Sequence, residues 1–272
     1  MDYKDFKCSC GQCFGFCCTA LYFSKTEGFP IDKPSGAPCP NLQKDFLCSV
    51  HQNLNKLGLK GCIAYDCFGV GQKTAQITYK GINWRQHPEK AEEMYKAFLL
   101  IHQLHEMLWY LMEAKYLRPD MEGLIEGIIK ETDAITRLDP EALLKTDMIS
   151  QRLKVNEVLK ATSESERKKF RSNKKAPLKF KKIFGGIPDL MGRDLRKYDL
   201  KGENFSGACL IAADLRDMDL SGTDLIGADL RDADLSGADL RHSIFLSQIQ
   251  INSAKGSKDT KLPHWLEKPV NW

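Results

Sequence analysis

Hydrophobic positions in the last third of the chain recur every five residues. Leu or Phe occupies each fifth position from 190 to 245, twelve times in register, and from 208 onward the residue two places earlier is mostly small. The residue between them is usually Asp. A period of five fits neither a helix nor a flat strand, whose side chains repeat at about 3.6 and 2 residues. It predicts a coil with four short sides that sends one large and one small side chain inward per side, with successive turns about 4.8 Å apart.

The middle of the chain, residues 88–166, has the spacing of amphipathic helices. Pro88 and the acidic residues after it predict a helix start, and apolar residues then recur at intervals of three and four up to about Leu117. Pro119 ends this helix, and a second one is expected before Asp139, which is placed to cap a third. The segment therefore predicts a helical bundle.

The 272 residues are 42% hydrophobic and 28% charged, which is typical of globular domains and not of a disordered chain. No apolar run approaches the roughly 20 residues that a membrane span needs. The first ten residues hold two Asp and two Lys without an apolar segment, so we expect no signal peptide and a cytoplasmic location.

Cysteine and charge are distributed in blocks. Nine of the ten Cys lie before position 88, residues 88–166 hold sixteen acids and ten bases, and residues 167–185 hold nine bases and no acid. These changes predict five segments: a Cys-rich metal-binding domain (1–87), a helical bundle (88–166), a basic linker (167–185), the repeat region (186–250) and a capping tail (251–272).

The repeats resemble a known family. Segments such as Ala228-Asp-Leu-Arg-Asp232 and Ala233-Asp-Leu-Ser-Gly237 match the motif Ala-(Asp/Asn)-Leu-x-x of pentapeptide-repeat proteins. This resemblance implies a right-handed quadrilateral β-helix. The expected fold class is therefore α+β and multidomain, with a small Cys-rich N-terminal domain, a helical middle and a C-terminal β-helix. Most of the chain is similar to bacterial pentapeptide-repeat proteins with a Cys-rich N-terminal region, and that resemblance implies no particular reaction.

The N-terminal cysteines predict a metal site. Such a density indicates disulfides in a secreted chain and metal ligation in a cytosolic one, and the lack of a signal peptide favours metal. Two pairs, Cys10 with Cys13 and Cys48 with His51, have the spacing of a tetrahedral zinc site. The candidate ligands are Cys8, Cys10, Cys13, Cys17, Cys18, Cys39, Cys48, His51, Cys62 and Cys67.

The identity of the metal stays open at this point. Residues 8–18 resemble zinc- or iron-chelating Cys-rich proteins, which implies zinc with iron as the alternative, and a thiolate cluster is also able to hold iron–sulfur. Adjacent Cys17 and Cys18 suit one common ion poorly because neighbouring side chains diverge. Buried reduced thiols with one or two disulfides are the alternative without a metal.

Three further features suggest functions more weakly. The loop Gly69–Thr74 resembles a phosphate-binding loop but lacks the required first Gly. His102, His105 and Glu106 share one helical turn, where capping and packing are favoured over metal ligation. If the chain binds nucleic acid, the basic run 167–182 is the place expected to do so, but a solvated linker between two acidic segments is the favoured interpretation.

The leading hypothesis is a metal-stabilised scaffold whose repeats offer a binding face to another protein. The alternative is a metal- or iron–sulfur-dependent enzyme or redox protein centred on the Cys cluster, and the sequence leaves open whether any catalysis occurs. A DNA-mimicking topoisomerase-protection protein fits less well, because the repeat region spans only about 14 Å and its net charge is 7 − 12 = −5. Its outward Asp residues are expected to keep near-reference pKa values and to take no part in catalysis.

Overall fold

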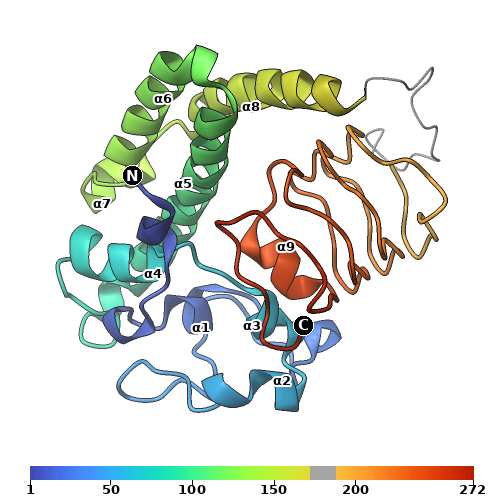
Figure 1. The fold of residues 1–272 in the computed structure, drawn as a ribbon. Helices are drawn as coiled ribbons and strands as arrows, with labels where there is room; N and C mark the ends of the chain where they lie inside the picture. Colours follow the sequence, from blue (N-terminus) through green and yellow to red (C-terminus); the bar gives the residue numbers. More distant parts are fainter. Residues whose placement is uncertain (172–187) are drawn as a thin grey trace. The chain divides into compact units, whose positions relative to one another are not determined.

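Two units make up the structure, a computed structural model that describes residues 1–171 and 188–272 (Figure 1). The first unit is Met1–Val158 and the second is Leu159–Trp272. The finer five-part division drawn from the sequence stays a prediction. The longer regular elements are helical: α1 (Phe16–Ala20), α2 (Leu54–Leu57), α3 (Lys60–Ala64), α4 (Val70–Lys73), α5 (Ala91–Leu117), α6 (Glu122–Ile135), α7 (Pro140–Leu144), α8 (Met148–Phe170) and α9 (Gln248–Ser253).

Short helical turns join these elements. They are the 3-10 turns η1 (Tyr3–Phe6), η2 (Cys10–Gln12), η3 (Lys25–Glu27), η4 (His51–Asn53), η6 (Pro88–Lys90) and η7 (Pro119–Met121), and the π-turn η5 (Thr74–Thr78). None of the helices in the described ranges has the length and apolar character that crossing a membrane requires.

The fold class expected from the sequence is wrong. An α+β protein with a C-terminal β-helix requires strands paired into a sheet, and residues 1–171 and 188–272 contain isolated bridges but no strand or sheet. The physical reason lies in the repeat, because one bridged residue on each side is followed at once by a turn. The protein is helical, and its repeats form a coil of turns held by single bridges.

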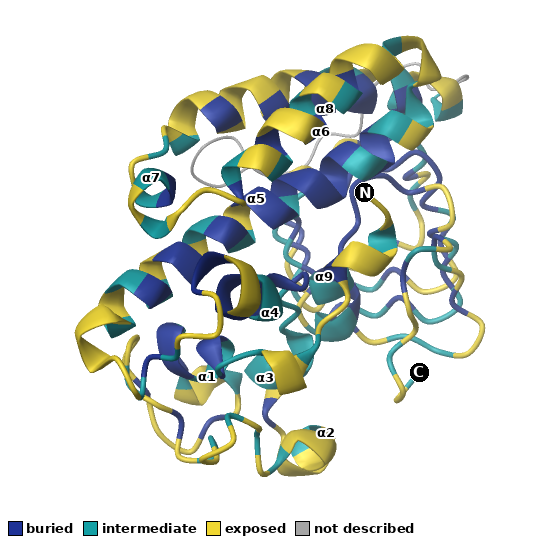
Figure 2. Cartoon of the chain, turned by 90° about the vertical axis from the view of Figure 1, so that its left-hand side faces the viewer, coloured by how far each residue is buried: buried dark blue, intermediate teal, exposed yellow. Residues whose placement is uncertain are grey.

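Helix α5 is the core of the first unit. It follows the Pro88–Lys90 turn and reaches Leu117, which confirms the sequence prediction. Its buried residues include Met94, Phe98 and Ile101, and Figure 2 shows buried segments of α5 alternating with less buried ones. Since α1, α6 and α7 all pack against it, α5 is hydrophobic on more than one face.

The third predicted helix starts where expected but is divided. The side chain of Asp139 accepts a hydrogen bond of 3.0 Å from the backbone N–H of Ala142, which caps α7. Helix α8 then begins in the first unit and ends in the second, so residues 167–170 of the basic run are its last turn. Arg171 follows the helix, and the other bases of that run, Lys174, Lys175, Lys179, Lys181 and Lys182, lie outside the described residues.

Residues 188–247, which we call the repeat coil, climb by one turn every twenty residues. Parallel bridges join Asp194 to Asp214, Asp214 to Asp234 and Asn204 to Asp224. Twenty residues per turn and five per repeat give four sides, as the sequence predicts. The ladder of large residues is at most 1% exposed throughout: Leu190, Leu195, Leu200, Phe205, Leu210, Leu215, Leu220, Leu225, Leu230, Leu235, Leu240 and Phe245.

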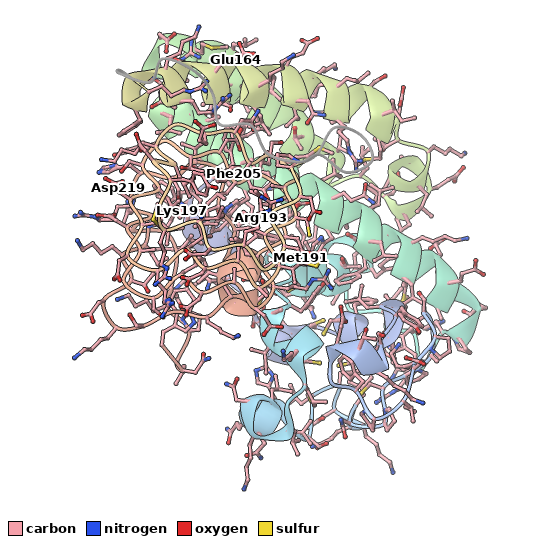
Figure 3. All side chains as sticks on the ribbon, turned by 90° about the vertical axis from the view of Figure 1, so that its right-hand side faces the viewer. Glu164, Met191, Arg193, Lys197, Phe205 and Asp219 are labelled. Atoms are coloured by element: carbon pink, nitrogen blue, oxygen red, sulfur yellow. The ribbon has the colours of Figure 1, made fainter. Side chains whose placement is uncertain are left out.

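The Asp that precedes each Leu shapes the next turn. In one repeat the backbone N–H of Arg216 donates to the carboxylate of Asp214 at 3.2 Å, and Asp229 receives the same bond from Arg231. A short carboxylate that binds the backbone two residues on is a standard turn device. Charged side-chain ends project outward from the coil as a result (Figure 3).

The end of the repeat coil is closed by the C-terminal segment. The side-chain amide of Gln250 in α9 donates to the carbonyl oxygens of Leu225 and Ala228 at 2.7 and 2.9 Å. Lys255 and Lys261 form bridges with Asp234 and Asp239, which continues the ladder beyond the last repeat. Backbone groups on the last turn thereby find partners that open edges would lack.

The end of α8 packs against one corner of the repeat coil. A Cβ at Gly222 would lie 2.4 Å from the ring of Phe170, and one at Gly202 would lie 2.5 Å from Cγ of Arg171. The Phe170 ring stacks at 6.2 Å on His242, which occupies the same corner one turn later. The glycines therefore make room for a helix as well as permitting the turn.

We expect Gly222→Ala to destabilise the second unit by about 1 kcal/mol more than Gly227→Ala. Both glycines have positive φ, 69° and 62°, so the backbone strain of an alanine is matched, but a Cβ at Gly227 meets nothing within 4 Å. Urea unfolding of both variants gives the difference, and equal losses would show that α8 does not depend on this corner.

Candidate functional site

The ten cysteines are reduced thiols in the described residues, and two pairs have close sulfur atoms. Sγ of Cys8 lies 3.2 Å from Sγ of Cys67, and Sγ of Cys17 lies 3.9 Å from Sγ of Cys18. Cys8 also contacts a carboxylate oxygen of Asp66 at 3.4 Å. The N-terminal segment thus brings together thiols that are far apart in the sequence.

The predicted ligand pairs both form turns. The backbone N–H of Cys13 donates to the carbonyl of Cys10 at 3.1 Å, and that of His51 donates to the carbonyl of Cys48 at 3.3 Å. Burial raises the pKa of Cys10, and the neighbouring thiols of Cys17, Cys8 and Cys48 raise it further. His51 itself is exposed.

Other candidate ligands are part of a hydrophobic core cluster. Cys39 is buried with Phe23, Phe29 and Leu59, and Cys18 and Cys62 pack against this cluster. Burial raises the pKa of Cys62 to about 12. Thiols in such surroundings behave as small apolar side chains. Across residues 1–171 and 188–272, no group of three or more His, Cys, Asp or Glu side chains is arranged to hold a metal ion.

The sequence analysis missed Lys33, which is only 4% exposed. Its Nζ donates to the carbonyl oxygens of Leu21 and Ala37 at 2.6 and 2.8 Å, and to those of Thr19 and Pro34 at 3.2 and 3.0 Å. Burial lowers its pKa, while the thiols of Cys39, Cys18 and Cys17 act in the opposite direction. No motif marks this residue, because its partners are backbone atoms that any sequence provides.

The two histidines of α5 hold the segment around Cys67. His102 donates from Nε2 to the carbonyl of Asp66 at 3.2 Å, and His105 donates from Nδ1 to the carbonyl of Phe68 at 2.8 Å. These contacts agree with the packing role favoured for them. In the loop Gly69–Thr74, Nζ of Lys73 lies 3.2 Å from a carboxylate oxygen of Asp133, so the charge of Lys73 is paired with a carboxylate of the same unit.

The pKa of His105 predicts a loss of stability in acid. Burial lowers that pKa from 6.5 to about 4, so the folded unit resists protonation that the unfolded chain accepts. Stability should therefore fall as the pH drops from about 6.5 to about 4, by up to about 3 kcal/mol. His105→Asn keeps a donor toward Phe68 without a titratable ring. Urea unfolding at pH 7 and pH 4.5 should show a smaller acid loss in this variant, and an equal loss contradicts the assignment.

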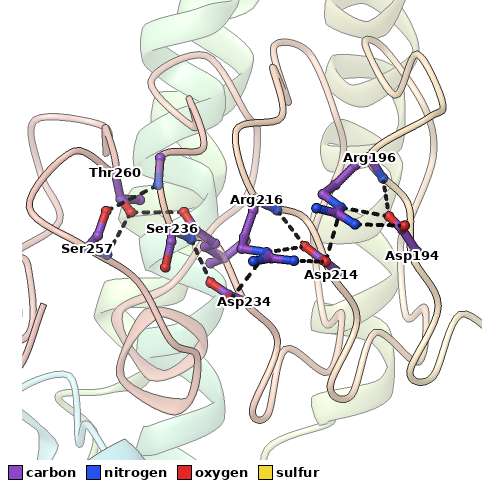
Figure 4. Close-up of polar contacts among 10 residues, drawn as sticks. Asp194, Arg196, Asp214, Arg216, Asp234, Ser236, Ser257 and Thr260 are labelled. Carbon is purple, nitrogen blue, oxygen red and sulfur yellow. Dashed lines mark hydrogen bonds and ion pairs between the residues drawn. The ribbon is translucent and has the colours of Figure 1, made fainter.

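The surface of the repeat coil carries paired charges (Figure 4). Arg216 binds Asp214 at 2.6 Å in its own turn and approaches Asp234 in the next at 3.7 Å. Hydrogen bonds from Arg196 lower the pKa of Asp194 to about 2. The expectation of near-reference pKa values is wrong here, because Arg follows the Asp.

The repeat aspartate Asp224 is buried, unlike the paired aspartates described above. Asp224 is 3% exposed and accepts a hydrogen bond from the hydroxyl of Ser163 in α8. Burial raises its pKa, while Ser163 and Arg167 act against that shift. Arg167 in turn donates from Nε to the carbonyl of Gly202 at 3.1 Å. The side of the coil that holds Asp224 is therefore occupied by α8.

Comparison with known proteins agrees with the geometry of the coil. Residues 208–245 match the family model for pentapeptide repeats, with 8 copies, so this part of the chain consists of pentapeptide repeats. The chain is also 48% identical over 274 residues to "Uncharacterized protein YybG" of Bacillus subtilis (strain 168), across 99% of this chain and 96% of that one. It belongs to the same family as that protein. The family match covers only the repeats, so the resemblance of the Cys block to metal chelators stays a hypothesis.

Proposed function

We propose that the protein is an interaction scaffold whose repeat coil binds another protein. The observation that carries the proposal is one side of the coil, the polar ladder, on which charges of both signs are fixed in a regular stack. Its members are Asp194, Arg196, Asp214, Arg216, Asp234 and Ser236, and Figure 4 draws their contacts.

The position of the polar ladder supports its use as a binding face. Asp214 precedes Asp224 by 224 − 214 = 10 residues, or two of the four sides, so the ladder lies opposite the side that α8 covers. Its side chains remain accessible, with Arg196 and Arg216 at 46% and 44% exposure. A partner would meet a rigid surface, because each guanidinium is already held by a carboxylate.

Site-specific cross-linking tests this proposal. A photo-cross-linking amino acid replaces Ser236 on the ladder, and in a matched variant it replaces Arg231, which is exposed on the adjacent side. We expect a defined protein to be captured in cells from position 236 only. For the identified protein, Arg216→Ala should weaken binding several-fold and Arg231→Ala, on the adjacent side, should not. Capture from neither position, or equal weakening by both arginine variants, would contradict the proposal.

A second proposal concerns metal. We propose that the turns Cys10–Cys13 and Cys48–His51 bind zinc, with iron or an iron–sulfur cluster as the alternative; in the iron case the Cys region would be the centre of a redox protein or enzyme. The spacing of the two residue pairs supports it, and each pair is held in a backbone turn. Elemental analysis and a visible spectrum of protein purified without chelator decide between the metals. Metal-free protein whose first unit melts at the same temperature with and without zinc would refute this proposal.

Two expectations remain predictions. Nucleic-acid binding through the basic run 167–182 depends on residues that mostly lie outside the described ranges. A cytoplasmic location rests on the sequence alone.

A further inference from the structure

Two sulfur atoms that lie close together belong to segments that are separately anchored. Cys8 and Cys67 are 59 positions apart, and their sulfurs are 3.2 Å apart. A disulfide bond is about 2.05 Å long, so the sulfurs need to approach by roughly 1.2 Å. A rotation of either side chain about its Cα–Cβ bond would move the sulfur over such a distance.

The backbone around Cys67 is fixed from both sides. The carbonyl groups of Asp66 and Phe68 accept hydrogen bonds from His102 and His105 of α5. The N–H of Phe68 also donates to the Asp66 carboxylate at 2.7 Å. These bonds place Cys67 on the buried side of the pair and limit its movement.

The backbone around Cys8 is fixed by one side chain. The amide of Gln72 donates to the carbonyl of Lys7 at 2.7 Å and accepts from the N–H of Ser9 at 3.0 Å. Phe6, which is 4% exposed, packs at 5.5 Å on the ring of Trp109. Cys8 itself is exposed. Residues 6–9, which we call the N-terminal arm, thus hold the accessible thiol of Cys8 next to the anchored thiol of Cys67.

We propose that Cys8 and Cys67 form a reversible disulfide that ties the N-terminal arm to the segment held by α5. The adjacent pair Cys17 and Cys18 is the less suitable one, since its sulfurs are 3.9 Å apart and neighbouring side chains diverge. The cross-link would close a loop from residue 8 to residue 67, and such a loop restricts the unfolded chain.

The oxidant is a small-molecule disulfide, for which oxidised glutathione is the probe. The accessible Cys8 loses its proton to solvent and attacks one glutathione sulfur, and the S–S bond of glutathione disulfide breaks with release of one glutathione thiolate. Cys67 then loses its proton to the released thiolate and attacks Sγ of Cys8, which expels the second glutathione as a thiolate that takes up a proton from solvent. Two protein thiols are oxidised and one glutathione disulfide is reduced to two glutathione molecules.

The test equilibrates the full chain, treated with chelator, in buffers of defined reduced and oxidised glutathione. Remaining thiols are alkylated, and digestion with mass spectrometry identifies linked peptides. We expect loss of two thiols, a Cys8–Cys67 peptide, reversal by reduced glutathione, and a melting temperature of the first unit higher by roughly 5–10 °C.

Three variants and a zinc arm make the outcome decisive. Cys8→Ser and Cys67→Ser should each abolish the two-thiol loss and the melting shift, whereas Cys209→Ser in the repeat coil should retain both. Stable glutathione adducts without a protein cross-link, or a cross-link between other cysteines, would overturn the proposal. Protection of both thiols by added zinc would instead assign the two sulfurs to a metal ion and also overturn it.

Discussion

Leu230→Asp should unfold the repeat coil. Leu230 is 1% exposed in the central ladder, with buried Leu residues one turn before and five residues to either side. A carboxylate there would have no partner, and burying an unpaired charge costs several kcal/mol, more than 4 kcal/mol when the lost packing is added. Circular dichroism melting of the full chain should show loss of the transition of the second unit.

The control for this change lies at the next position. The side chain of Arg231 is 57% exposed and pairs with Asp229, and Ser already occupies the equivalent position in other repeats at 221 and 236. Arg231→Ser should shift stability by no more than about 0.5 kcal/mol. Similar melting of the two variants would mean that the inward and outward positions are misassigned.

Lys33→Met should destabilise the first unit by about 3 kcal/mol or more. Methionine keeps the length of the side chain but removes the ammonium group, so four carbonyl oxygens that now accept bonds from Nζ would lose a charged donor inside the protein. Urea unfolding followed by Trp fluorescence measures the loss.

An exposed lysine of the same unit provides the comparison. Lys25 lies in η3 and is exposed, so Lys25→Met should leave the unfolding midpoint nearly unchanged. Lys33→Arg distinguishes the contribution of the positive charge from that of the side-chain shape. Arginine keeps the charge, but its guanidinium has to fit a space that the ammonium group of Lys33 now fills. Wild-type stability of Lys33→Met would show that solvent already satisfies those carbonyls.

The repeat pattern predicted the inward and outward positions of the coil correctly, because the same five-residue period is repeated at twelve positions and a wrong register would fail at all of them. It did not predict the absence of a sheet. Strand assignment depends on consecutive bridged residues, whereas Asp214 and its equivalents form one bridge each before the chain turns. The resemblance to pentapeptide-repeat proteins implied a β-helix. The backbone hydrogen bonds of the structure show single bridges in place of strands, and this corrects the fold class.

The N-terminal site shows a different limit of sequence reasoning. Spacing identified the turns at Cys10 and Cys48, which are local, and it could not tell that Cys39 packs in an apolar cluster or that Cys8 faces Cys67. Such contacts depend on how distant segments fold together. The end of α8 is a similar case, since Phe170 belongs to a basic run and yet its ring contacts a glycine corner of the coil.

The four-sided turn of the coil restricts the insertions and deletions that the repeat-coding part of the gene tolerates. Each repeat advances the chain by a quarter of a turn, so loss or gain of one repeat before residue 224 would move Asp224 away from Ser163 and bring another residue beneath α8. It would also bring the closing segment onto a different side. Insertions and deletions that preserve the docking of α8 should therefore occur in steps of four repeats, and homologous genes should differ here by multiples of about sixty base pairs.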